Sequence, residues 1–92
     1  MGLTGDDLEW SLRITKRLVS KGVAKSHHKQ PQTIAGWFAT HDRGKVKDVL
    51  DDMVADSDTP LVRKGRGTVT LLSIQDGKRY LEDNGRQPPS TW

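Results

Sequence analysis

The sequence predicts a small α+β domain that is mostly helical, with a three-helix core, a β-hairpin and a C-terminal helix. Apolar residues recur at helical spacing in most of the chain, and one segment near the C-terminal end, 61–72, places β-branched and apolar residues around a turn of glycines and cations. The length of 92 residues fits one domain. We expect that domain to occupy residues 1–85 and an irregular tail, with two consecutive prolines, to occupy residues 86–92.

The first helix is expected to begin after Thr4 or Gly5 and to run to about Val23. Six residues at helical spacing form one core-facing stripe: Leu8, Leu12, Thr15, Leu18, Val19 and Val23. Trp10 and Ile14 lie four residues apart on another face and form a second apolar patch. Either other elements cover this patch, or it is the seam of a homodimer.

Two further helices are expected over residues 33–39 and 43–55, after a polar connection at residues 26–32. The shorter helix presents bulky apolar groups, of which Trp37 and Phe38 are expected in the core. The longer one has the clearest helical period of the chain, at Val46, Val49, Leu50, Met53 and Val54. Two helices joined by a short turn in this way form a helix-turn-helix unit.

A basic hairpin and a last helix complete the pattern. Arg63, Lys64 and Arg66 are interleaved with Gly65 and Gly67, and we expect the two glycines to be structural, because a hairpin turn needs a positive φ angle somewhere. Ser73 precedes Asp76 by three residues, in the spacing of a capping box, so a helix of roughly ten residues should begin there and stop at Asn84-Gly85.

The order of helix, helix, helix, hairpin and helix resembles the winged helix-turn-helix superfamily, especially its small prokaryotic and archaeal members. In these proteins the hairpin is commonly followed by a leu-thr-x-x-gly-x-x-x-leu segment. Residues 72–81 look like a variant of that segment, with Ser73 in the Thr position and Gly77 one residue later. The resemblance covers about residues 6–85. It implies that the protein binds duplex DNA and regulates transcription, with the third helix in the major groove and the hairpin, the wing, on the backbone or minor groove.

Candidate DNA-binding residues lie in three segments: the start of the third helix, the wing, and the loop after the first helix. They are Arg43, Lys45 and Lys47, then Arg63, Lys64 and Arg66, and finally His28 and Lys29.

The outward face of the third helix is acidic, because it carries Asp48, Asp51 and Asp52. Two arrangements accommodate these carboxylates. The helix could enter the groove by its basic N-terminal turn. Alternatively, the basic surface of the first helix, the Lys25 to Lys29 loop and the wing bind another anion or a partner protein. The second possibility makes the chain a protein-interaction module that does not contact DNA directly.

Composition excludes several other classes. The net charge is +3, and an acidic middle segment, 42–58, separates two basic ones. The chain has no cysteine and therefore no disulfide or thiolate site. No nucleophile motif, phosphate-binding loop or metal-ligand spacing is present, so we expect no enzyme activity, cofactor or metal. No long apolar run is present either, so we expect a cytoplasmic location and no membrane partner.

Overall fold

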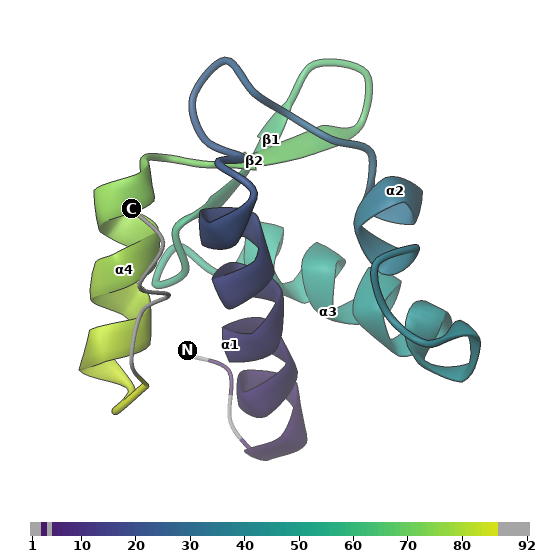
Figure 1. The fold of residues 1–92 in the computed structure, drawn as a ribbon, viewed down its shortest axis with the longest axis horizontal. Helices are drawn as coiled ribbons and strands as arrows, with labels where there is room; N and C mark the ends of the chain where they lie inside the picture. The colour runs from purple at the N-terminus through teal and green to yellow at the C-terminus, as the bar shows by residue number, and fades with distance from the viewer. Residues whose placement is uncertain (1–2, 4, 87–92) are drawn as a thin grey trace.

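The computed structural model describes residues 3 and 5–86 as an α+β fold that is mostly helical, as the sequence predicts. The elements are α1 (Gly5–Ser20), α2 (Pro31–Ala35), the 3₁₀ turn η1 (Thr40–Asp42), α3 (Arg43–Ala55), β1 (Leu61–Lys64), β2 (Thr68–Leu71) and α4 (Ile74–Asp83). In Figure 1, α4 lies on one side of α1 and α2 and α3 lie on the other, with the antiparallel hairpin above them. None of the described helices has the length and apolarity needed to cross a bilayer.

Helix α1 ends earlier than predicted, at Ser20 rather than about Val23. Gly22 has a φ of +69°, which is the left-handed conformation that closes many helices. The Val23 N–H donates to the Leu18 carbonyl at 2.9 Å, and the Gly22 N–H donates to the Val19 carbonyl at 3.1 Å. These two bonds form a Schellman motif, which turns the chain away from the helix axis and toward the hairpin.

The segment after α1 is not merely a connection, contrary to the prediction for residues 26–32. The Lys25 N–H donates to the Leu71 carbonyl at 3.1 Å, and Lys29 and Val69 exchange backbone hydrogen bonds of 3.0 and 2.8 Å. The Thr70 hydroxyl also donates to the His27 carbonyl at 2.8 Å. Residues 24–29 therefore cover the edge of β2 that β1 leaves open. Backbone atoms make this pairing. The polar side chains of the segment therefore gave no indication of it in the sequence.

Helix α2 was predicted over residues 33–39 but occupies Pro31–Ala35. Proline is tolerated at the first position of a helix, because the N–H that it lacks has no partner there. Trp37 and Phe38 consequently lie on the turn that follows α2, where they are half-buried against the core. The prediction that both are core residues is thus only partly right. Helix α3 begins and ends where the sequence predicts.

Of the two alternatives for the apolar patch on α1, the structure supports cover by other elements for Ile14, which is therefore not available to a homodimer seam. Ile14 has an exposed fraction of 0% and belongs to the same core cluster as Leu18 and Val49. Trp10 is half-buried and packs edge-to-face on Phe38, with ring centroids 6.0 Å apart. The turn after α2 supplies this cover, which the spacing of residues on α1 could not reveal.

The hairpin pairs Leu61 with Leu71 and Lys64 with Thr68, which leaves a turn of residues 65–67. Gly67 has a φ of +79°, as predicted, but the second positive φ belongs to Arg66, at +60°, and not to Gly65. The expected positive φ of the turn is thus supplied by Gly67 together with Arg66, and Gly65 does not contribute one.

Helix α4 has the predicted Ser73 N-cap, and the Asp76 carboxylate accepts from the Ser73 hydroxyl rather than from the Ser73 backbone N–H. The Asp76 N–H donates to the Ser73 hydroxyl at 3.0 Å, and that hydroxyl donates to the Asp76 carboxylate at 2.9 Å. The helix ends before Asn84-Gly85, also as predicted. Of the predicted tail, residues 87–92 lie outside the described residues. The Arg86 N–H donates to the Leu81 carbonyl at 2.8 Å and so closes the helix.

Candidate nucleic-acid interface

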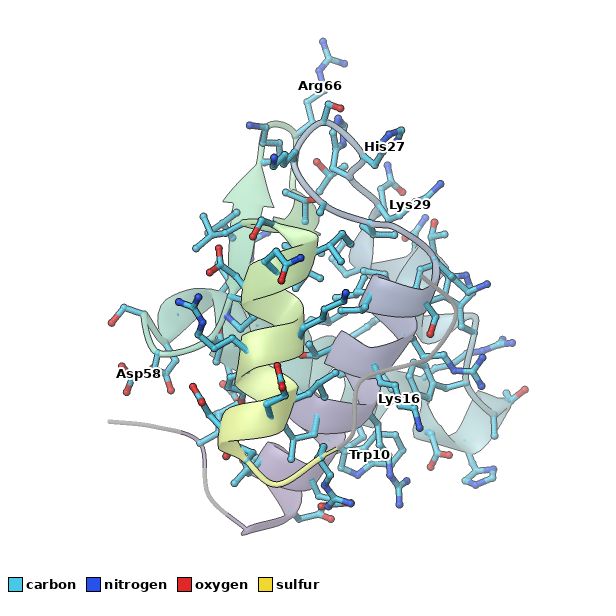
Figure 2. All side chains as sticks on the ribbon, turned by 60° about the vertical axis from the view of Figure 1, so that its left-hand side comes forward. Trp10, Lys16, His27, Lys29, Asp58 and Arg66 are labelled. Atoms are coloured by element: carbon cyan, nitrogen blue, oxygen red, sulfur yellow. The ribbon has the colours of Figure 1, made fainter. Side chains whose placement is uncertain are left out.

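The hairpin turn and the segment after α1 form a single cationic surface at one end of the molecule. The backbone pairing of Lys29 with Val69 holds that segment beside β2, and both loops lie at the top of Figure 1. Figure 2 shows Arg66 at the tip, with His27 and Lys29 below it. We call this surface the basic end; its exposed side chains are Lys25, His27, His28, Lys29, Lys64 and Arg66.

Within the described part of the chain, no carboxylate forms an ion pair with the cations of the basic end. Within residues 3 and 5–86, every ion pair with atoms closer than 4.0 Å involves other cations. An exposed cation without a carboxylate neighbour is available to an anionic ligand such as a phosphate. Of the predicted DNA-binding residues, the structure thus brings four together: His28, Lys29, Lys64 and Arg66.

Two cations of the basic end occupy a backbone conformation that L-residues rarely adopt. Lys25 has a φ of +57° and Arg66 one of +60°, and they are the only non-glycine residues with positive φ among those described. This conformation costs a residue with a Cβ roughly 1 kcal/mol. Glycine would avoid the cost at both positions. Local strain of this kind is concentrated at functional sites, where the side chain is needed.

Lys45 and Arg63 form ion pairs with carboxylates of the chain, in contrast to the described cations of the basic end. The Lys45 ammonium lies 2.6 Å from an Asp7 carboxylate oxygen and 3.6 Å from one of Asp6. The hydrogen bond to Asp7 is the main reason why the pKa of Lys45 is raised above its ordinary value. Lys45 therefore links the start of α3 to the first turn of α1. The Arg63 guanidinium lies 3.4 Å from an Asp51 carboxylate oxygen, which ties β1 to α3.

The other two predicted residues, Arg43 and Lys47, are exposed on the first turns of α3. They are not part of the basic end. In Figure 1 the hairpin turn is at the top, whereas α3 crosses the lower half of the fold. The next residues on the exposed surface of α3 are the three carboxylates Asp48, Asp51 and Asp52. A ligand bound across α3 would therefore meet mainly negative charge.

A second cationic surface lies on α1, and the candidate residues chosen from the sequence do not include it. Arg13, Arg17 and Lys21 are exposed and four residues apart, with Lys16 between them. From the sequence, the basic surface of the first helix enters only the alternative to direct DNA binding, and none of these four residues is among the DNA-binding candidates. With Ser20 and Phe38 they line one groove, which we call the α1 groove.

Neither a candidate metal centre among the described residues nor similarity to a known protein gives further evidence about function. Among the described residues, no group of three or more His, Asp or Glu side chains is placed to hold a metal ion. Comparison with family models, with curated proteins and with solved structures gave no significant match. The function is therefore inferred from the residues of the chain itself.

Proposed function

We propose that the chain is a small winged helix-turn-helix protein of the transcription-regulating kind, which binds duplex DNA through its basic end. One observation carries this proposal. The hairpin turn and the segment after α1 lie side by side and form one surface of exposed cations. These cations have no carboxylate partner in the described structure. The order of three helices, a hairpin and a fourth helix supports the choice of fold. Winged-helix architecture places such a hairpin against the DNA backbone or in the minor groove.

Phosphate contacts account for most of the expected affinity. Lys64 and Arg66 project from a narrow hairpin turn, and Lys29 projects from the segment beside it. Such side chains donate to phosphate oxygens and carry no sequence information by themselves. Binding should therefore tolerate mixed sequence and weaken steeply with salt, because each neutralised phosphate releases counterions.

The acidic surface of α3 indicates which side of the protein the duplex contacts. Asp48, Asp51 and Asp52 are exposed, and duplex DNA carries one negative charge per ~1.7 Å of its axis. A duplex on the hairpin side avoids this repulsion, so α3 is not the main contact element in our proposal. The same acidic surface supports the alternative function, a protein-interaction module that meets a basic partner and does not bind DNA.

A salt titration of binding to a mixed-sequence duplex separates the two functions. We expect the wild-type protein to bind at micromolar concentration in about 50 mM salt, with log K falling linearly against log salt concentration. Fluorescence anisotropy of a labelled duplex measures both quantities. No binding at tens of micromolar protein under these conditions would exclude the DNA proposal and favour the protein-interaction module.

Substitutions of Arg66 separate its contribution to DNA binding from its effect on the stability of the fold. Arg66→Gly should weaken duplex binding about fivefold and reduce the salt slope by about 0.9, because one phosphate contact is lost. It should also raise the free energy of unfolding by roughly 1 kcal/mol, because glycine adopts positive φ without strain. Arg66→Lys is the matched control, since it keeps both the charge and the strained conformation and should bind like the wild type. Equal binding by all three proteins would remove Arg66 from the interface.

A further inference from the structure

The α1 groove has the composition of an anion site. It encloses about 640 Å³, and its lining residues are four cations, one hydroxyl and one aromatic ring: Arg13, Lys16, Arg17, Lys21, Ser20 and Phe38. No carboxylate is among them. Glu9, one turn before Arg13 on α1, is bound instead to the Arg86 guanidinium. The positive charge of the groove is therefore uncompensated within the described structure.

Three of these four cations lie over aromatic rings. The Arg13 guanidinium lies 5.0 Å from the Trp10 ring centroid, the Arg17 guanidinium 5.8 Å from that of Phe38, and the Lys21 ammonium 4.8 Å from that of Trp37. A side chain that already rests on a ring loses less conformational freedom when it binds a ligand. The cations also occupy the ring faces that bases of a single strand would need for stacking. The groove thus presents oriented cations to a ligand.

The four-residue spacing of these cations does not stabilise α1 through side-chain pairs. Arg13 and Arg17, and likewise Arg17 and Lys21, are like charges four residues apart, which destabilises a helix. An anionic ligand along this face would reverse that effect. A helix rises about 1.5 Å per residue, so the three cations extend over about 12 Å. That length is enough for the three cations to reach more than one phosphate of the same DNA strand.

A nucleic-acid backbone fits the groove better than a protein partner does. Protein interfaces have an apolar centre from which lysine is depleted. Among the described residues, Leu72 is the single large apolar side chain that is exposed, and it does not line the groove. Lys21, which lines the groove just after α1, is four residues before Lys25 of the basic end. Figure 2 shows Lys16 on the same side of the molecule as Lys29, with Asp58 on the opposite side.

We propose that the phosphate backbone of a duplex bound at the basic end continues along α1 and lies in the α1 groove. This inference rests on the proposed function. It adds a second contact region and places the duplex against α1 rather than across α3. The guanidinium groups of Arg13 and Arg17 donate to phosphate oxygens, while Lys16 and Lys21 contribute further positive charge.

The test replaces groove arginines by glutamine, which keeps a long side chain and good helix propensity but removes the charge. Arg17→Gln should weaken duplex binding about fivefold and lower the salt slope by about 0.9, and the double variant Arg13→Gln/Arg17→Gln should lower the slope by about twice as much. Arg79→Gln is the matched control, because Arg79 is an exposed arginine on α4 outside the α1 groove. It should bind within about twofold of the wild type, since it removes no phosphate contact.

The outcomes distinguish the two proposals. If Arg66→Gly weakens binding and the glutamine variants do not, the groove proposal is wrong and the basic end remains the DNA site. If the wild-type protein binds no duplex, the proposed function is wrong and the groove proposal fails with it. If Arg17→Gln abolishes binding to an acidic peptide such as polyglutamate but leaves duplex binding unchanged, the groove is a protein site and our inference is overturned.

Discussion

Gly77→Val is expected to lower the free energy of unfolding by about 3 kcal/mol, at the upper end of the cost of overpacking a core. Gly77 is the point of closest approach between α4 and its neighbours. A Cβ atom there would lie 2.7 Å from Val19 Cγ2 and 2.9 Å from Leu71 Cδ1. Both partners are buried, so neither can move without disturbing the core. A domain of this size has only about 5–10 kcal/mol of stability, so the loss is large.

Gly44→Val is the control for that experiment, because it makes the same substitution in another helix. A Cβ at Gly44 would have no atom within 4 Å, and the residue has no positive φ. Valine has a higher helix propensity than glycine, so this variant should be as stable as the wild type or slightly more so. Chemical denaturation followed by circular dichroism measures both variants. Equal stability of the two would mean that α4 does not pack closely on α1 and β2.

The sequence correctly predicts the features that depend on neighbouring residues within one element. The bounds of α3 follow from its apolar period, and the start of α4 follows from the Ser73 and Asp76 cap. Gly77, which the resemblance singled out as a shifted glycine, has a clear packing reason. In each of these cases, neighbouring residues on one element contain enough information to determine the structure.

Features that depend on contacts between distant segments were missed. The backbone pairing of residues 24–29 with β2 has no side-chain signature, so the basic end could not be assembled from the sequence. The ion pairs of Lys45 with Asp7 and of Arg63 with Asp51 join residues that are far apart in the chain. Both cations were therefore predicted to be available to DNA. Ile14 was assigned to a surface patch because its helix position alone does not show what covers it.

Reversing two charges of the basic end should have the largest effect on binding. We expect Lys29→Glu/Lys64→Glu to weaken duplex binding by about 100-fold in low salt, because each change removes a phosphate contact and adds a repulsion. The two residues come from different loops that β2 brings together, so the double variant tests the assembled surface. Their side chains are exposed, and the thermal midpoint should stay unchanged because surface substitutions usually alter stability little.

The control for charge reversal is Arg79→Glu, compared with Lys64→Glu alone. Each single variant changes the net charge equally, and both residues are exposed. Lys64→Glu should weaken binding about tenfold, whereas Arg79→Glu should have an effect of twofold or less. If the two variants lose affinity equally, net charge rather than the basic end determines binding.

The surface that contacts DNA can be located by following the backbone amide resonances of the protein while a short mixed-sequence duplex is added. We expect the largest chemical-shift changes at residues 25–29 and 64–68, with further changes on the exposed face of α1. The acidic surface of α3, residues 48–52, should change little, because its carboxylates are kept away from the phosphates. Changes concentrated on α3, with residues 25–29 and 64–68 unaffected, would contradict the claim that this protein binds DNA through its basic end.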